Sequence, residues 1–312
     1  MSTIRESLEQ YVAVRRALGS QFLEPAGALS QFVDFVEGSG SEFITIEHAV
    51  RWATKPQFVQ RATWSRRLCQ VRGFARWLSA IEPRTEVPPR GLLRIGHRRN
   101  RPYIYADEEI EKLMNEAAAL PSASGLRGQT YEALIGMLAS TGLRPGEALA
   151  LNRADVELQT GILSVRQTKH GKSRFVPVEH SVQEAFRRYT RRRDELCPHP
   201  RDDAFLLSER GSRLKGHSAR RTFARISRAI GIREALARPG IGRGPRLQDF
   251  RHTFATKKII EWYRAGLDIQ QELPKLSRYL GHSQTVDTYW YIQAVPELLR
   301  LATERLERVG DR

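Results

Sequence analysis

The sequence has little cysteine and no long apolar run. Its only two cysteines, Cys69 and Cys197, lie far apart without a histidine set nearby, so neither a disulfide framework nor a zinc site is indicated, and both thiols are expected to be reduced. No apolar stretch approaches the roughly 18 residues of a membrane-spanning helix, and the polar start MSTIRESLEQ does not resemble a signal peptide. We therefore expect a cytoplasmic protein without a membrane partner.

Clustered metal ligands are also lacking. The eight histidines are scattered, no HExxH-like spacing places two of them on one helical face, and no group of carboxylates stands out. A metal-dependent nuclease, which needs such a cluster, is disfavoured. We expect neither a metal nor a cofactor.

Negative charge is in short supply. The chain has 51 lysines and arginines against 35 acidic residues, which gives a formal net charge of +16. Such an excess attracts polyanions over about one Debye length. Nucleic acid is therefore the first partner to consider, and the protein is expected to associate with the nucleoid.

The 312 residues are enough for two domains. Apolar residues at three- and four-residue spacing predict helices from Ile4 to about Pro83. The following stretch, EPRTEVPPRGLLRIGHRRNRPY, holds four prolines and six arginines without a period, which predicts an extended linker. We assign residues 1–84 to a helical domain, 85–102 to the linker and 103–312 to a second domain.

One predicted helix of the first domain, which begins at Thr63, has a basic face. Its apolar residues recur at helical spacing, while the arginines lie on its other sides or near the border. A basic face is either solvated or placed against a phosphate backbone. The candidate DNA contacts of this helix are Arg66, Arg67, Arg72 and Arg76.

The second domain contains both helix and strand signals. A predicted helix over residues 131–140 ends at Thr141, where Gly142 suits the left-handed position after a helix, and Pro145 begins the next helix. Two β-rich runs at 162–167 and 174–178 flank the turn TKHGKS and predict a hairpin. The remainder looks largely helical. The expected fold class is thus mostly α, with a small β-sheet in the second domain.

Four segments of this domain resemble the catalytic domain of the tyrosine recombinases, the phage integrase family. They are TGLRPGE with Arg144, the hairpin turn with Lys169, QDFRHTFAT with Gln248 and Arg251, and LGH with His282, nine residues before Tyr291. Each segment alone is weak, because an arginine after a helix end or a lysine in a turn usually meets solvent. Their order and spacing carry the resemblance, which covers roughly residues 103–295. The first domain resembles the family's core-binding domain in size and character only.

The resemblance implies a role for each motif residue. Arg144 and Arg251 match the two catalytic arginines, Lys169 the hairpin lysine that serves as general acid, His282 the family's histidine or tryptophan position, and Tyr291 the nucleophile. Attack on a phosphodiester adds negative charge at phosphorus, which fixed donors stabilise. Arginine forks can hold the non-bridging oxygens, so the reaction needs no metal. A phosphotyrosyl bond keeps the energy of the broken linkage, so it needs no ATP.

One position departs from the family pattern. Gln248 stands where the HxxR box begins with a histidine, three residues before Arg251. Glutamine can donate a hydrogen bond but cannot take up or deliver a proton, so any acid-base role of this position is either absent or filled by another residue. The adjacent His252 is expected to be a hydrogen-bonded structural histidine.

The nucleophile has a competitor. Tyr289 lies two residues before Tyr291, and neighbouring aromatic residues are more often packing groups than reactive ones. The nine-residue spacing from His282 selects Tyr291.

Further basic and amphipathic segments lie outside these motifs. Lys215, Arg220 and Arg221 belong to a predicted helix within residues 213–232 and are candidate phosphate contacts. The tail at 296–309 predicts an amphipathic helix that docks on a neighbouring protomer, as often in the family, or on its own domain.

The resemblance implies site-specific recombination through a 3′-phosphotyrosyl intermediate, for the integration, transposition or resolution of a mobile element. Its implied partners are double-stranded DNA with inverted-repeat sites, gripped by the two domains as a clamp, and further copies of the chain, as a tetramer in synapsis. Other recombinases are further candidate partners. Two alternatives remain. A type IB topoisomerase shares the chemistry, although the LGH-to-tyrosine segment favours a recombinase. Gln248 also leaves room for a DNA-binding accessory protein with a decayed site.

Overall fold

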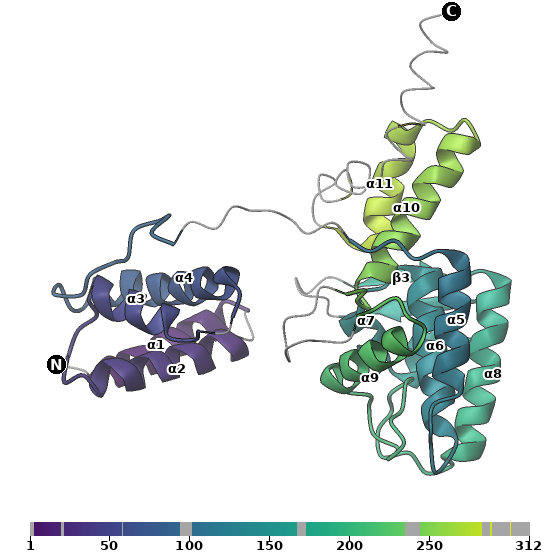
Figure 1. Cartoon of the computed structure of the whole chain (residues 1–312), viewed down its shortest axis with the longest axis horizontal. Coiled ribbons are helices and arrows are strands. Elements are labelled where there is room, and N and C mark those ends of the chain that lie inside the picture. The colour runs from purple at the N-terminus through teal and green to yellow at the C-terminus, as the bar shows by residue number, and fades with distance from the viewer. Residues whose placement is uncertain are drawn as a thin grey trace, which may run out of the picture. The chain divides into compact units, whose positions relative to one another are not determined.

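The computed structural model describes residues 3–19, 22–57, 59–93, 102–166, 173–234, 244–282, 288 and 300. The chain divides into two compact units, Met1–Arg99 and Asn100–Arg312, each with its own hydrophobic core (Figure 1). Lys169, Tyr289 and Tyr291 lie outside the described residues, as does the predicted tail helix apart from Arg300.

The described part of the first unit is helical, as predicted. Its helices are α1 (Ile4–Ala17), α2 (Leu23–Glu37), α3 (Ile46–Thr54) and α4 (Arg61–Leu78). Helix α4 contacts each of the other three. Its apolar face is buried as the spacing predicts, because Leu68, Val71, Phe74, Ala75 and Leu78 are each 2% exposed or less.

Local caps determine where two of these helices begin. Thr3 precedes α1, and its hydroxyl accepts a hydrogen bond from the amide of Glu6, whose carboxylate accepts one from the amide of Thr3. Thr45 precedes α3, and its hydroxyl accepts from the amide of His48. Each cap satisfies amide groups that the first turn of a helix leaves unpaired.

The segment expected to be a linker begins in contact with the first unit. The amide of Glu86 donates to the carbonyl of Ile44 at 2.8 Å. Arg72 on α4 donates through Nε to the carbonyl of Pro88 at 2.7 Å and through Nη2 to that of Pro89 at 2.9 Å. Extended proline-rich backbone leaves its carbonyls unpaired, so a guanidinium can bind them. The first residues of the predicted extended linker therefore contact the helices of the first unit.

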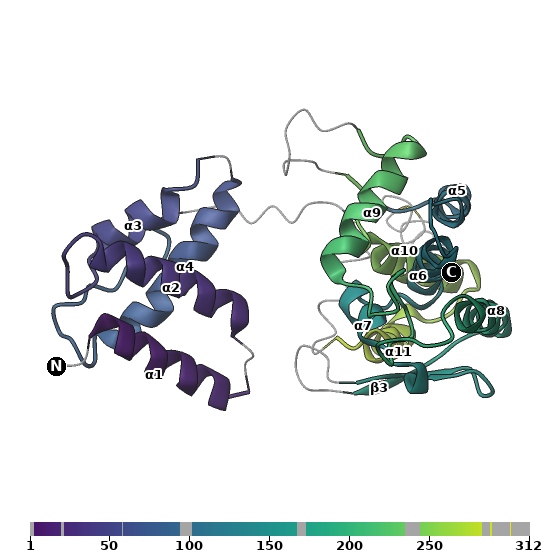
Figure 2. The same cartoon turned by 90° about the horizontal axis from the view of Figure 1, so that it is seen from below.

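Three helices of the second unit lie side by side (Figures 1 and 2). They are α5 (Asp107–Ala118), α6 (Leu126–Thr141) and α8 (His180–Leu196), and α6 contacts both of the others. Leu134, Ile135, Met137 and Leu138 of α6 are fully buried. Successive positions around this helix are thus covered, which marks it as the centre of the unit. It begins at Leu126 rather than near the predicted start at Tyr131.

Further helical elements belong to the described part of this unit. They are α7 (Pro145–Ala150), the 3₁₀ turn η1 (Arg153–Asp155), α9 (Gly216–Ala229), α10 (Asp249–Arg264) and α11 (Ile269–Leu280). Helix α10 packs on both α6 and α11, and α7 packs on α6 and α9. The ends of α6, α7, α10 and α11 consequently meet in one region.

A small antiparallel sheet completes the described part of the second unit. Its strands are β1 (Val156–Glu157), β2 (Ile162–Val165) and β3 (Arg174–Pro177), in the order β1-β2-β3. The pairing of β2 with β3 confirms the predicted hairpin, and its register sets Val165 opposite Arg174. The two residues of β1 are too few to produce an alternating sequence pattern.

These elements confirm the expected fold class, mostly α with a small β-sheet. Within the described ranges, no helix combines the length and apolar character needed to cross a bilayer. In the same ranges, no three His, Cys, Asp or Glu side chains are grouped as ligands for a metal ion.

Candidate active site

The turn between α6 and α7 carries the first candidate arginine. Helix α6 ends at Thr141, and Gly142 adopts the left-handed conformation (φ 60°) while its amide donates to the carbonyl of Leu138 at 3.1 Å. Pro145 then begins α7, with Arg144 as its N-cap residue. The predicted helix end and the predicted start at proline are both confirmed.

Packing also requires glycine at position 142. A Cβ atom there would lie 2.6 Å from Cδ1 of Phe254 on α10 and 3.1 Å from Cδ2 of Leu280 on α11. Neither distance leaves room for a methyl group, and the positive φ disfavours any side chain. Gly142 therefore allows α10 and α11 to approach the end of α6.

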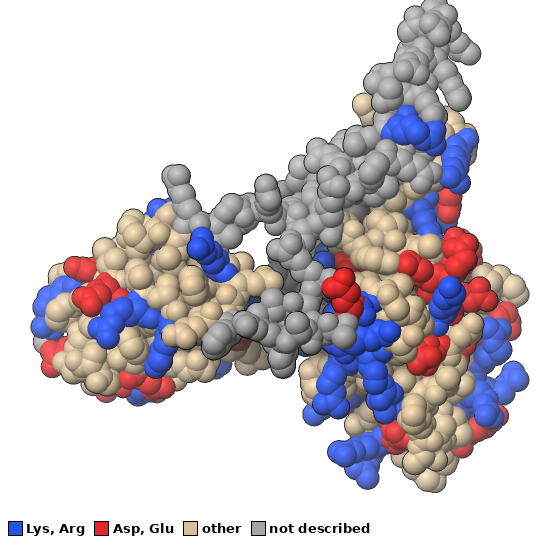
Figure 3. Space-filling model, viewed as in Figure 1, with Lys and Arg blue, Asp and Glu red and all other residues tan. Residues whose placement is uncertain are grey.

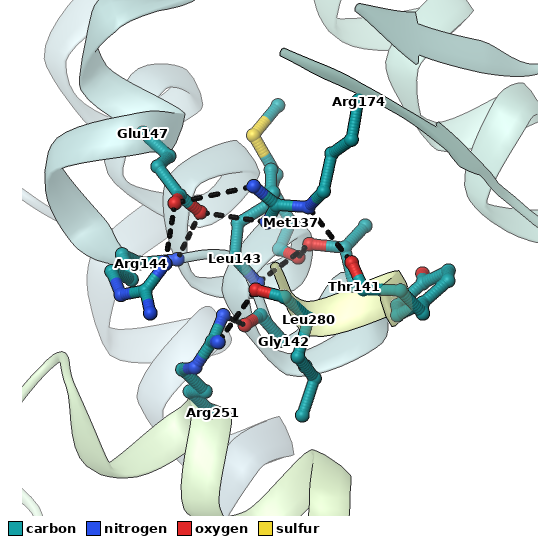
Figure 4. A network of polar contacts seen from close by, with 10 residues as sticks. Met137, Thr141, Gly142, Leu143, Arg144, Glu147, Arg174, Arg251 and Leu280 are labelled. Carbon is teal, nitrogen blue, oxygen red and sulfur yellow. Dashed lines mark hydrogen bonds and ion pairs between the residues drawn. The ribbon is translucent and has the colours of Figure 1, made fainter. Parts of the chain in front are cut away.

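Arg251 on α10 is almost completely buried, with 1% of its surface exposed. Its Nη1 donates to the carbonyl of Gly142 at 3.0 Å and its Nη2 to the carbonyl of Leu280 at 2.6 Å (Figure 4). Both carbonyls lie at C-terminal helix ends, where aligned peptide dipoles place partial negative charge. Because Gly142 is two residues from Arg144, these bonds bring the two candidate arginines into one site.

The carboxylate of Glu147 lies between two arginines and is 8% exposed. Arg144 donates to it through Nη1 at 2.8 Å and through its backbone amide at 3.0 Å. Arg174 donates through Nη2 at 2.9 Å and Nη1 at 3.3 Å. Burial alone would raise the pKa of Glu147, but hydrogen bonds and positive charge from Arg174, followed by the bonds from Arg144, outweigh it and hold the pKa below its usual value.

Neither Glu147, the last residue of TGLRPGE, nor Arg174 was predicted to belong to the site. The sequence does indicate the contact of Glu147 with Arg144, because Glu147 stands three residues after Arg144, the spacing of a capping box. No sequence pattern indicates the role of Arg174, since its ion pair joins positions 27 residues apart on different elements. Its Nε also donates to the carbonyl of Tyr279 on α11 at 2.8 Å.

Gln248 and His282 lie next to the same contacts. Gln248 immediately precedes α10, and its carbonyl accepts from the amide of Arg251 at 3.2 Å. His282 follows Gly281, the left-handed residue that ends α11, and comes two residues after Leu280. The Nδ1 atom of His282 lies 2.8 Å from the hydroxyl of Thr288. Four of the six predicted catalytic residues, Arg144, Gln248, Arg251 and His282, thus border one junction, and the other two lie outside the described residues.

His252 lies beside Arg251 and is partly buried. Burial lowers the pKa of its imidazole from 6.5 to about 4, with the positive charges of Arg246 and Arg251 acting in the same direction and the carboxylate of Asp249 opposing them. The imidazole is therefore neutral at neutral pH and adds no charge to the site.

The basic face predicted on α4 is only partly available. Arg67 donates to the carbonyl of Trp52 at 2.9 Å, and its guanidinium carbon lies 3.6 Å from the centre of that indole ring. Arg72 holds the proline carbonyls described above. Arg66 forms an exposed ion pair with Glu24, and Arg76 is exposed. Packing within the first unit thus occupies Arg67 and Arg72, whereas Arg66 and Arg76 keep their heads at the surface.

The predicted basic residues of α9 are at the surface. Lys215, Arg220 and Arg221 are exposed, and so is Arg225 one turn further on. Figure 3 shows lysine and arginine side chains gathered over this helix. The surface of α9 therefore carries concentrated positive charge.

A separate groove of about 570 Å³ lies between α5, α6, α8 and α10. Its lining includes the apolar residues Ile110, Met114, Val182 and Phe186. Ion pairs of Lys257 with Asp107 and of Lys258 with Glu261 border it. The groove thus combines an apolar floor with a charged rim.

Comparison with known sequences places this chain in a family. Residues 104–297 match the family model described as the phage integrase family. The chain is 42% identical to a putative integrase/recombinase, y4rB, of Sinorhizobium fredii, in an alignment that covers 99% of this chain and 98% of that protein. It is 27% identical to the tyrosine recombinase XerC of Thermodesulfovibrio yellowstonii over 74% of this chain and 71% of that one.

Solved structures share the fold. The Tn1549 transposon integrase in complex with a circular intermediate DNA matches with a TM-score of 0.66 and 17% identity, over 98% of this chain and all of that one. The XerH site-specific recombinase bound to its palindromic difH substrate matches with a TM-score of 0.63 and 19% identity, over 90% and 78% of the two chains.

The lowered pKa of His252 predicts a pH dependence of stability. An unfolded chain would protonate this imidazole near 6.5 and the folded chain only near 4, so the unfolded state binds more protons between these values. The contribution of His252 is complete above pH 6.5 and is lost as the pH falls toward 4. The melting temperature of the wild type should therefore fall more over this window than that of His252→Gln. Parallel melting curves would contradict a buried neutral imidazole.

Proposed function

The chain belongs to the phage integrase family, the tyrosine recombinases, and from this membership we propose that it is an active, site-specific recombinase of a mobile element. Members of the family cleave and rejoin DNA. In the proposed reaction Tyr291 attacks a phosphodiester and forms a 3′-phosphotyrosyl bond, which a second DNA strand then resolves. The same strand exchange, carried out within the nucleoid, serves to integrate, transpose or resolve such an element.

One observation carries the proposal of an active site. Arg251 donates to the carbonyl of Gly142, a residue 109 positions earlier in the chain and two before Arg144. A protein that only binds DNA has no need to bury a guanidinium in order to join two arginine segments, because phosphate contacts at a surface suffice. Two guanidinium groups in one place suit the five-coordinate phosphorus, whose added charge is greatest in the transition state.

The proposed division of labour follows from the chemistry of each side chain. Arg144 and Arg251 stabilise the charge on the non-bridging oxygens without a metal. Lys169 protonates the leaving 5′ oxygen, a role that typically contributes about 10²–10⁴-fold. His282 and Gln248 provide further hydrogen bonds to the phosphate. No nucleotide is consumed, because the phosphotyrosyl bond retains the energy of the broken linkage.

The proposed partners are a DNA duplex with inverted-repeat sites and further copies of the chain. The exposed cations of α9 and those of α4, Arg66 and Arg76, suit phosphate contacts of a clamp formed by two units. The amphipathic tail would dock in the apolar groove between α5, α6, α8 and α10 of a neighbouring protomer, which links protomers within a synaptic tetramer. A type IB topoisomerase would act alone and has no use for this exchange.

The nucleophile is tested with a nicked suicide substrate, whose recombination site is taken from the DNA that flanks the gene. We expect Tyr291→Phe to form no covalent protein–DNA complex while its DNA affinity stays within a few-fold of wild type, because only the attacking oxygen is removed. Tyr289→Phe, the matched control two residues away, should still form the complex. Covalent attachment that survives in Tyr291→Phe and disappears in Tyr289→Phe would move the nucleophile to Tyr289.

Gln248 tests how the site works without the family's histidine. If it only donates one hydrogen bond to a phosphate oxygen, Gln248→Ala should slow cleavage by the equivalent of about 1–3 kcal/mol. Gln248→His should remain active, and faster below about pH 6.5, where the imidazole gains a charge. The measurement is the rate of covalent complex formation against pH. An alanine variant as inactive as Tyr291→Phe would require Gln248 to do more than donate one bond.

The tail is tested by truncation after Pro296. We expect synaptic assembly on DNA to weaken while the affinity of a single protomer stays within a few-fold, as measured by gel shift. Ala133→Glu places a charge in the groove and should cause the same defect, whereas Ala119→Glu on the exposed end of α5 should not. Normal synapsis by the truncated protein would reject the exchange, and normal synapsis by Ala133→Glu would reject this groove as the acceptor.

A further inference from the structure

Arg174 makes more contacts near the candidate site than its place in a small strand requires. It is the first residue of β3, and 12% of its side chain is exposed. Its guanidinium bonds the carboxylate of Glu147 with two nitrogens and the carbonyl of Tyr279 with the third. A strand residue that only paired in the sheet would need none of these side-chain bonds.

The contacts of Arg174 join two of the segments that border the site. Glu147 belongs to α7, which begins beside Arg144, and Tyr279 lies three residues before His282 at the end of α11. A Cβ atom on Gly281 would lie 2.8 Å from Nη1 of Arg174, so the guanidinium packs directly on the backbone next to His282. Arg174 thus connects the sheet with the Arg144 turn and with the end of α11.

Glu147 is the group through which Arg174 can act on the reaction. Its carboxylate is buried and bonded by Arg174 and Arg144 from different sides (Figure 4). Coulomb energies of separate pairs add, so Arg144 experiences the attraction of Glu147 together with the repulsion of Arg174 beside it. The net electrostatic hold on Arg144 therefore depends on the charge of Arg174.

On the basis of the proposed recombinase function, we infer that Arg174 is a positioning residue. It balances the charge of Glu147, so that Glu147 orients Arg144 without holding its guanidinium away from the DNA phosphate. If Arg174 were neutral, the full charge of Glu147 would fall on Arg144, which then competes poorly for the phosphate. The same carboxylate that fixes Arg144 in the native protein would become an inhibitor of it.

Two substitutions separate charge from shape at this position. Arg174→Gln removes the charge but keeps an amide that can donate to the Tyr279 carbonyl, whereas Arg174→Lys keeps the charge and gives up the two-pronged geometry. We expect Arg174→Gln to slow covalent complex formation on the suicide substrate roughly tenfold or more, on the scale seen for partners that orient the ligands of a site. Arg174→Lys should stay within a few-fold of wild type.

The decisive arm combines Arg174→Gln with Glu147→Gln. Removing the carboxylate charge should restore part of the lost rate, because Arg144 is no longer bound by an unbalanced anion while a neutral acceptor remains for its orientation. A merely structural role predicts the opposite, since the second substitution removes a further buried contact and lowers the rate again. DNA affinity and melting temperature are measured for each full-length variant.

Arg187 provides a matched control in the same unit. It also bonds one carboxylate, that of Glu184, and one backbone carbonyl, that of Leu158, but it lies on α8 away from the site. Arg187→Gln should leave the cleavage rate unchanged at temperatures where the variant is folded. A rate loss equal to that of Arg174→Gln would show that any arginine of this unit that bridges a carboxylate and a carbonyl matters, and it would overturn the inference.

The outcomes distinguish the inference from the function on which it rests. A wild-type protein that forms no covalent complex overturns the proposed function itself. An active wild type with an equally active Arg174→Gln, or without rescue by Glu147→Gln, overturns only the role of Arg174. Arg174→Lys tests the inference even if Arg174→Gln does not fold. A folded Arg174→Lys whose covalent complex formation is slowed more than about tenfold would contradict charge balance as the cause.

Discussion

The architecture of the second unit depends on the burial of one guanidinium group. Removing a charge from water costs several kcal/mol even after the protein relaxes, and Arg251 is 1% exposed. The C-terminal ends of α6 and α11 offset that cost, through the carbonyls of Gly142 and Leu280. A rotation of either helix would take away one of these two carbonyl acceptors. The relative positions of α6, α10 and α11 are therefore restricted by this residue.

That restriction explains why the neighbouring residues have so little freedom. Position 142 requires glycine, because the side chains of Phe254 on α10 and Leu280 on α11 occupy the space that a Cβ atom would need. The chain then leaves α6 in a left-handed turn and enters α7 at Pro145, which places Arg144 two residues after the carbonyl that Arg251 binds and lets Glu147 bond the guanidinium of Arg144. The proposed arrangement of the arginines thus follows from the packing of the ends of α6, α10 and α11 against one another.

The parts of the fold that local chemistry determines could be predicted from the sequence. The helix end at Gly142, the start at Pro145 and the hairpin around residues 162–177 each have a turn or capping signal within a few residues, and the structure confirms them. The ion pair between Arg174 and Glu147 joins different elements and has no local pattern. The contact of Arg72 with the backbone of residues 88–89 in the predicted extended linker has no local pattern either.

The excess of positive charge at the site explains why its neighbours His252 and Gln248 carry no charge. The residues drawn in Figure 4 include three guanidinium groups, those of Arg144, Arg174 and Arg251, and a single carboxylate, that of Glu147, which Arg144 and Arg174 bind. An excess of positive charge in a partly buried region is costly until an anion arrives, and every further cation would add to that cost. His252 adds none, because burial keeps its imidazole neutral at neutral pH. Gln248 adds none by its chemistry, at the position where the family's histidine could carry a proton. A phosphate group would relieve the excess, so the same imbalance that limits the stability of the empty site would favour its binding to DNA.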